Sequence, residues 1–173
     1  AVVYKERQEN FGKDRPSNTC LPHSVTDFDA HHMPKKVIQT PGVLVILFES
    51  YHSFRQIFTD GGALPKEREP AWFGYSVGRW EDDMLIVDST GFNDKSWLMS
   101  AMQPHTEEVH MTERIRNVAG GKFLENKVVM EDRHALTSAY TFNRYYKKLN
   151  EEFEPNVCNE DPETWKKYRD DAL

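Results

Sequence analysis

The chain has 173 residues, of which 38% are hydrophobic and 29% charged, and its formal net charge is −6. This length is enough to bury a hydrophobic core without metals or cross-links, and no apolar run approaches the roughly 20 residues of a membrane-spanning helix. The basic residues are scattered among acidic ones, which argues against a nucleic-acid-binding surface. We therefore expect one soluble domain that does not bind nucleic acid and has no membrane-spanning segment.

Residues 1–36 contain many charges and three prolines, and we expect them to form an extended arm that lies over the domain. Two strands are predicted next, over residues 37–40 and 43–48, with a Pro-Gly turn between them. The second of these segments is apolar throughout and rich in β-branched residues, a pattern typical of a strand covered on both faces. Residues 54–59 predict a third strand.

Further strands are predicted over residues 72–80, 85–88, 107–118, 122–131 and 140–149. Residues 89–106 lack periodicity and are expected to form a long loop, a kind of segment that is often functional. At Asp161, an N-cap residue is followed by Pro and Glu, which predicts a short C-terminal helix. The fold class is therefore mainly β: an antiparallel meander that forms a barrel or a strongly curved sheet. Within this single domain, residues 1–36 are the arm, 37–149 the sheet, and 150–173 the tail and helix.

The hairpin around Gly120-Gly121 is the most informative part of the sequence. If these glycines form a two-residue turn, Ala119 faces Lys122 and the register of both strands follows. One face then has apolar side chains around Glu113 and Asn126, and the other pairs His110 with Glu131 and Arg116 with Glu125, as a solvated surface would. Glu113 is therefore predicted to point inward.

A buried carboxylate is costly unless it is paired or hydrogen-bonded. Glu113 is thus a candidate general acid or base, or the polar anchor of a ligand pocket, with His105 as a second proton-transfer group. The alternative is a structural carboxylate held by Arg55 or Tyr75. A one-residue bulge would exchange the two faces of the hairpin.

Metal and nucleophile chemistry have little support in the sequence. His105, His110 and Glu113 suggest metal ligands, but on a regular strand His110 and Glu113 point to opposite sides. There is no HExxH motif, no CxxC pair, no GxSxG elbow and no phosphate-binding glycine loop. We expect neither a metal nor a cofactor.

Aromatic residues gather in the sequence around the long loop and are candidates for lining a pocket, although packing in the core explains each one singly slightly better. The candidate ligand contacts are Arg55, Trp72, Tyr75, Trp97, Met111 and Asn126.

The two cysteines, Cys20 and Cys158, lie in polar segments near the two ends of the chain. Such segments are not the usual surroundings of buried thiols. Their spacing alone leaves two readings open, two free thiols or one cross-link, and an oxidising compartment follows only from the second.

Several motifs together resemble a family of uncharacterised exported proteins that are abundant in acidobacteria and other environmental bacteria. They are Val37-Ile38-Gln39-Thr40-Pro41-Gly42, Phe54-Arg55-Gln56-Ile57-Phe58-Thr59-Asp60-Gly61, Gly74-Tyr75-Ser76-Val77-Gly78-Arg79-Trp80-Glu81, Gly91-Phe92-Asn93-Asp94, Pro104-His105-Thr106-Glu107 and Thr112-Glu113-Arg114. The likeness spans roughly residues 10–160, whereas residues 23–33 and 133–146 look unusual for the family. It implies a small β-rich fold, a periplasmic or secreted location and a Cys20–Cys158 disulfide. It implies no reaction.

By analogy of fold alone, small exported barrels are similar to lipocalin-like proteins, which hold apolar or aromatic molecules. The first functional hypothesis is therefore a barrel that binds a small apolar or aromatic molecule in an interior pocket, with Glu113, Asn126 and His105 as polar contacts. The second is a cofactor-independent hydrolase, lyase or isomerase that uses Glu113 and His105 in the same pocket, with Arg55 or Tyr75 as substrate anchor. The third is a partner-binding domain without a pocket. The oligomeric state does not follow from the sequence.

Overall fold

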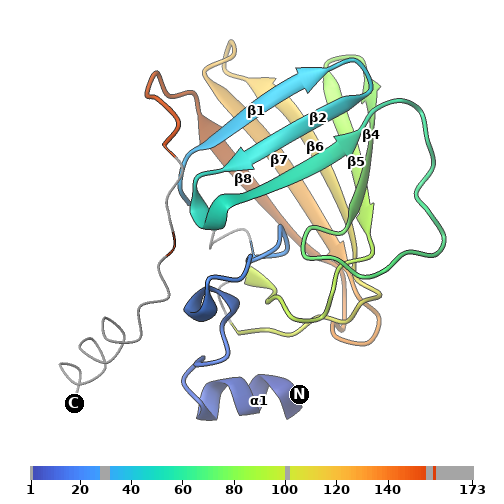
Figure 1. Ribbon diagram of the computed structural model, residues 1–173. Helices are drawn as coiled ribbons and strands as arrows, with labels where there is room; N and C mark the ends of the chain where they lie inside the picture. Colours follow the sequence, from blue (N-terminus) through green and yellow to red (C-terminus); the bar gives the residue numbers. More distant parts are fainter. Residues whose placement is uncertain (1, 28–31, 100–101, 155–157, 159–173) are drawn as a thin grey trace.

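The computed structural model describes residues 2–27, 32–99, 102–154 and 158, and eight strands form a single sheet in the order β1-β2-β3-β4-β5-β6-β7-β8 (Figure 1). The strands are β1 Lys35–Thr40, β2 Val43–Phe48, β3 Ser53–Phe58, β4 Tyr75–Glu81, β5 Met84–Thr90, β6 His110–Val118, β7 Phe123–Glu131 and β8 Tyr140–Lys147. The mainly β fold predicted from alternating and β-branched segments is confirmed, and the C-terminal helix expected from Asp161 lies outside the described residues.

The β6–β7 hairpin has the predicted register. His110 pairs with Glu131 and Glu113 pairs with Val128. Pairing ends one step earlier than expected, at Val118 and Phe123, because Ala119 has a positive φ of 52° and joins the two glycines in the turn. The turn is therefore longer than two residues, but the inward and outward faces of both strands are those that the sequence predicts.

The prediction of an antiparallel meander is wrong at one place: β3 and β4 are parallel and pair only through Ile57 with Ser76 and Phe58 with Val77. A parallel pair needs a crossover of a dozen or more residues, and residues 59–74 supply one. All other neighbouring strands are antiparallel.

The sheet curls so that β1, β2 and β3 lie in front of β4–β8 (Figure 1). No pairing between β1 and β8 occurs in the described part of the chain, so the fold is a strongly curved half-barrel and not a hydrogen-bonded closed barrel. Its inner face is filled by two apolar clusters. The first contains Val25, Phe48, Phe92, Leu98, Met99, Val109, Met111, Val128 and Met130, and the second Leu44, Ile57, Leu85 and Val87.

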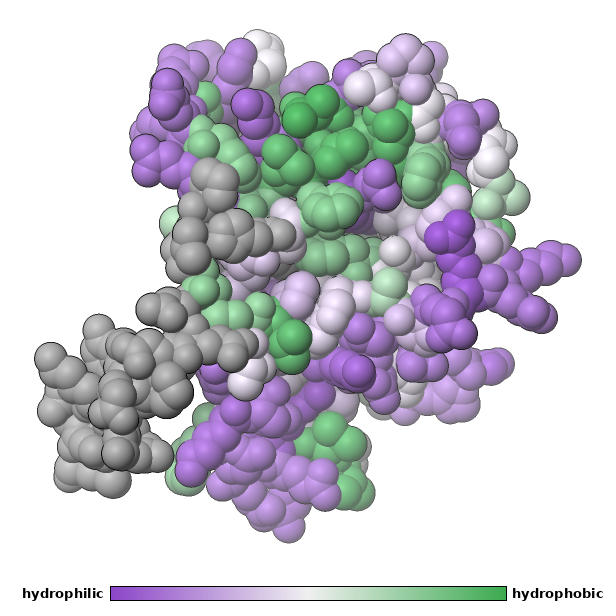
Figure 2. Space-filling view, in the orientation of Figure 1, coloured by the Kyte–Doolittle hydropathy of each residue, from purple (hydrophilic) through white to green (hydrophobic). Residues whose placement is uncertain are grey.

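The expectation that β2 is covered on both faces is wrong. Its inner side chains Leu44 and Phe48 are buried, but Val43, Val45 and Leu47 on the other face are only half-buried. Hydrophobic side chains gather over this outer face of β1–β3 (Figure 2), where Phe54 is 56% exposed. The apolar run of β2 thus reflects one buried face and one partly exposed apolar face.

The N-terminal segment is not extended throughout, because it contains helix α1 (Val2–Glu9) and the 3-10 turn η1 (Pro16–Thr19). It packs on the 91–106 loop through Trp97, whose ring has the guanidinium groups of Arg7 and Arg15 at 5.2 and 5.3 Å from its centre. Helix α1 is largely exposed and lacks the apolar stripe that would have predicted it.

Cys20 and Cys158 form a disulfide, as the family resemblance implied. The bond ties the segment after η1 to the chain beyond β8. Among the described residues, no helix is long and apolar enough to cross a membrane. A second short 3-10 turn, η2 (Ser50–His52), connects β2 to β3.

Candidate functional site

Glu113 lies at the centre of the inner face and is 1% exposed. One carboxylate oxygen accepts a hydrogen bond from Arg55 Nη2 on β3 at 2.5 Å, and the other accepts one from Asn126 Nδ2 on β7 at 2.8 Å. The inward direction of Glu113 follows from the alternation of β6, but its partner on β3 is brought in by the curl of the sheet. The buried charge is thus paired and hydrogen-bonded on both oxygens.

Arg55 extends this network to two more strands. Its Nε donates to Ser76 Oγ at 3.1 Å and its Nη2 to Ser89 Oγ at 2.9 Å, and the two hydroxyls are 2.9 Å apart. All five side chains of this polar network are buried: Arg55, Ser76, Ser89, Glu113 and Asn126. Asn126 Oδ1 is buried and accepts no hydrogen bond from the described residues. An acceptor left in this state costs free energy, which a donor on a ligand would recover.

Inner-face side chains of the two edge strands remain partly exposed. Val37 on β1 shares the inner face with its neighbour Ile46 on β2, yet it is 51% exposed. On β8, Arg144 lies opposite Asn126 and Tyr146 lies opposite Leu124, and both are half-buried. We call the inner-face residues Lys35, Val37, Phe142, Arg144 and Tyr146 the β1/β8 edge. Arg144 of this edge lies opposite Asn126 of the polar network in the pairing of β7 with β8.

Lys35 connects the two edge strands, since its Nζ lies 4.3 Å from the centre of the Tyr146 ring and 5.9 Å from that of Phe48. Burial lowers the pKa of Lys35 to about 8, although nearby Glu113 acts in the opposite direction. Burial also raises the pKa of Tyr146, so this phenol stays neutral. The sequence analysis missed Lys35. The signal was its position two residues before Val37, which puts both side chains on one face of a strand.

His105 belongs to a different cluster, in the 91–106 loop. Its Nε2 lies 2.7 Å from Ser96 Oγ and its Nδ1 lies 3.0 Å from the Thr106 carbonyl oxygen. With Nδ1–H donating to that carbonyl, Nε2 is the acceptor for the Ser96 hydroxyl. Thr26 Oγ1 also lies 3.0 Å from Ser96 Oγ, which attaches the N-terminal segment to the loop. Ser96 is fully buried, so this Ser–His contact holds the loop and does not present a nucleophile.

Asp132, just after β7, anchors the other side of this loop. Burial would raise the pKa of its carboxyl, but hydrogen bonds from the backbone N–H groups of Thr106, Ala135 and His134 outweigh burial and lower it. The Thr106 N–H contributes a bond of 2.6 Å to Asp132 Oδ2. Neither Thr26, Ser96 nor Asp132 had a sequence signal, because these contacts join segments far apart in the chain.

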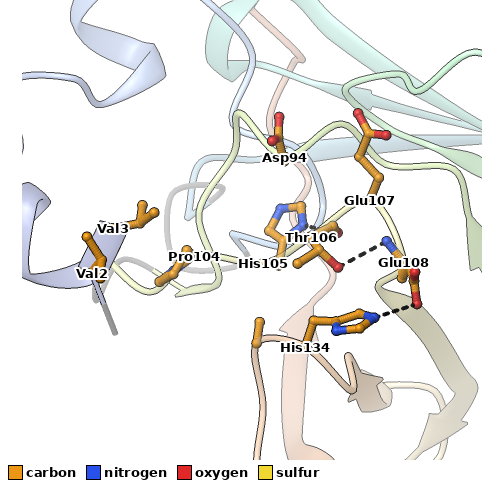
Figure 3. Close-up of a pocket in the computed structure, with 10 residues that line it drawn as sticks. Val2, Val3, Asp94, Pro104, His105, Thr106, Glu107, Glu108 and His134 are labelled. Atoms are coloured by element: carbon orange, nitrogen blue, oxygen red, sulfur yellow. Dashed lines mark hydrogen bonds and ion pairs between the residues drawn. The ribbon is translucent and has the colours of Figure 1, made fainter.

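A shallow hollow of about 680 Å³ lies beside this cluster, between α1 and the loop (Figure 3). Val2 and Val3 of α1 lie on one side of it, and His134, in an ion pair of 3.3 Å with Glu108, lies on the other. The remaining lining residues are Asp94, Pro104, His105, Thr106, Glu107 and Ala135. Glu113 does not line this hollow, so His105 and Glu113 are not brought together there.

The other predicted ligand contacts are distributed over the molecule. Tyr75 is on the face of β4 opposite to Ser76; it stacks on Phe58 at 5.2 Å, with Arg68 over its ring at 3.6 Å. Tyr75 is therefore not a partner of Glu113, and of the two partners that the sequence left open it is Arg55 that holds the carboxylate. Trp72 is half-buried in the 59–74 crossover, Trp97 is buried under the N-terminal segment, and Met111 is in the first apolar cluster.

His110 and Glu113 lie on opposite faces of β6, as the alternation of a strand predicts. His110 lies on the outer face, 3.5 Å from Asp88 Oδ1 and 3.8 Å from Glu131 Oε2, opposite to the inward Glu113. In the part of the chain that the structure describes, no group of three or more His, Cys, Asp or Glu side chains is arranged to bind a metal ion.

The buried His105 predicts a pH dependence of stability. Burial lowers its pKa from the ordinary 6.5, outweighing the hydrogen bond to the Thr106 carbonyl. The folded state therefore binds fewer protons than the unfolded state, and the stability that neutral His105 contributes is complete above the unfolded pKa and declines as pH falls through the lowered folded value. We expect the free energy of unfolding, measured by urea titration, to fall between about pH 7 and pH 5.

The matched variants are His105→Gln and His134→Gln, because both histidines line the hollow but only His105 is buried. His105→Gln should flatten the pH dependence, and His134→Gln should leave it. The same slope in wild type and His105→Gln would show that other groups cause it.

Comparison with known protein families, curated proteins and solved structures gives no match for this chain.

Proposed function

We propose that this protein is an exported binding protein that holds a small, mostly apolar or aromatic molecule on the inner face of its curled sheet, at the β1/β8 edge. The observation on which the proposal rests is that this inner face is apolar, is partly exposed at Val37, and also contains the buried acceptor Asn126 Oδ1. A mostly apolar surface with a few convergent polar groups is the usual composition of a small-molecule site.

The disulfide supports the exported location. Disulfides persist in oxidising compartments and are rare in the cytosol of most organisms. Cys20 and Cys158 are both in the disulfide, so no free thiol is present. A periplasmic or secreted protein is therefore the proposal that fits the redox state of the chain.

Binding is better supported than acid–base catalysis. A catalytic carboxylate needs a substrate within hydrogen-bond reach, whereas both oxygens of Glu113 already accept hydrogen bonds from Arg55 and Asn126. His105 donates to a backbone carbonyl and accepts from a buried serine. Both groups are thus engaged in holding the fold.

The test is fluorescence titration with N-phenyl-1-naphthylamine, an uncharged aromatic probe that brightens in apolar surroundings. We expect saturable binding to the wild-type protein. Val37→Asp should weaken the affinity about tenfold or more, because it puts a charge on the apolar inner face.

Ile38→Asp is the matched control, since Ile38 is the next residue of β1, is 41% exposed and points to the outer face. It should bind the probe like wild type. Absence of saturable binding would overturn the proposal. So would a loss of affinity in Ile38→Asp alone, which would assign the probe to the apolar outer face of β1–β3.

A further inference from the structure

We infer that the preferred ligand bears an anionic group, a carboxylate or a group of like charge, that is bound by Lys35 and Arg144 while its apolar body lies on the inner face. This inference rests on the proposed function and names the class of molecule for the same site. It comes from the charges and aromatic rings of the β1/β8 edge.

Lys35 is a cation with unused hydrogen-bonding capacity. Its ammonium has three N–H donors, yet with the described residues it makes no hydrogen bond or ion pair, only contacts with the faces of Tyr146 and Phe48. A half-buried ammonium in this state has lost hydration without gaining a charged partner. An anion that enters beside the Tyr146 ring would give the ammonium hydrogen-bond acceptors in place of water and a partner of opposite charge.

The charge balance at this edge favours an anion. Three cations act within one neighbourhood: Lys35, Arg55 and Arg144. Glu113 is the carboxylate among the groups that act on Lys35 and Tyr146, and its two oxygens are taken by Arg55 and Asn126. Among these described groups the cations outnumber the carboxylates, although the whole chain has a net charge of −6.

The surroundings of the cations indicate what the anion is attached to. Lys35 lies over Tyr146, and the Arg144 guanidinium lies 4.8 Å from the centre of the Phe142 ring. Apolar and aromatic surface thus begins immediately beside the charges. A strongly hydrated inorganic anion would gain little from it, whereas an aromatic or alkyl carboxylate would bury its body and pair its head group.

The experiment compares two competitors that differ in one charge. Bound N-phenyl-1-naphthylamine is displaced by 1-naphthylacetate or by its uncharged methyl ester at neutral pH. For wild type we expect the acid to compete about tenfold more strongly than the ester. Lys35→Met should remove most of this preference, and Lys35→Arg, which keeps the charge, should retain it.

Lys36→Met is the matched control, because Lys36 is exposed on the outer face of the same strand. It should keep the preference for the acid. Equal competition by acid and ester in wild type, or the same change in Lys36→Met as in Lys35→Met, would overturn the inference while leaving probe binding intact. Failure of the probe itself to bind would overturn the proposed function together with it. Thermal unfolding of each variant checks that Lys35→Met is folded, and Arg144→Met replaces it if it is not.

The preference should also depend on pH. Lys35 has a pKa of about 8 in the free protein, and binding an anion raises it. Glu113 and Arg144 act on the charge of Lys35, Tyr146 lies against its ammonium, and Arg55 acts on Tyr146. Lys35 is not the only cation at this edge, so the preference for the acid should shrink as pH rises through this range but not vanish, and competition by the ester should stay constant. A preference that is constant across this range in wild type would overturn the role of Lys35.

Discussion

Glu113→Gln is expected to lower the free energy of unfolding by about 3 kcal/mol, because it leaves the Arg55 guanidinium charged and buried without its counter-ion. Glutamine has nearly the same shape and its amide oxygen still accepts one hydrogen bond, so the loss reports mainly the charge. Arg55 is 2% exposed, and its remaining acceptors Ser76 and Ser89 are neutral hydroxyls. Urea unfolding followed by circular dichroism measures the change.

Two further variants test the cause of this loss. Glu125→Gln breaks the 2.7 Å ion pair with Arg116 on the outer face of the same hairpin, and it should change stability far less. The double variant Arg55→Met/Glu113→Leu removes both buried charges and should be more stable than Glu113→Gln alone. If Glu113→Gln and Glu125→Gln lowered the free energy of unfolding equally, the loss in Glu113→Gln would not come from the burial of the Arg55–Glu113 ion pair.

Removing the disulfide is expected to have an effect of similar or larger size. Cys20→Ser/Cys158→Ser removes the cross-link between two residues that are 138 positions apart in the sequence. In the chain-entropy treatment, a loop of this length corresponds to about 5 kcal/mol of stabilisation through the unfolded state. We expect a lower urea midpoint, and also a steeper dependence of the unfolding free energy on urea, because the open unfolded chain exposes more surface.

Reduction of the wild-type protein with dithiothreitol is the matched control, and it should reproduce the midpoint of the double serine variant. Mass measurement without reductant provides the independent readout of the bond. Two free thiols in protein folded under oxidising conditions, or a double serine variant as stable as wild type, would contradict this role of the bond.

These experiments separate two properties: the stability of the fold and the binding of a ligand at the β1/β8 edge. Glu113 and Arg55 hold five strands together through Ser76, Ser89 and Asn126, so their replacement changes the fold's stability first. Lys35 and Val37 lie on an edge strand and are partly exposed, so their replacement is tolerated better. Variants at the β1/β8 edge are therefore the ones that report on the ligand.

The inward direction of Glu113 was determined by the sequence alone. Apolar and polar side chains alternate along residues 107–118 and 122–131, and a glycine turn lies between them, so few pairing registers of the two strands are possible. A slip of one residue would have exposed the whole apolar face. Local rules of this kind also predicted the strands themselves, since each depends only on neighbours within a few residues. The Cys20–Cys158 bond is different, because spacing left it open and the resemblance of both segments to an exported family implied it.

Tertiary structure alone decided the partners. Arg55 and Tyr75 were equal candidates for Glu113 until the parallel pairing of β3 with β4 put Arg55 inside and left Tyr75 on the other face. Lys35 meets Tyr146 only because the curl brings the first and last strands of the sheet together. Such contacts join residues more than 50 positions apart, and no periodicity encodes a distance of that kind. The alternation of a strand sets which way a side chain points, and the packing of the whole sheet sets what it meets.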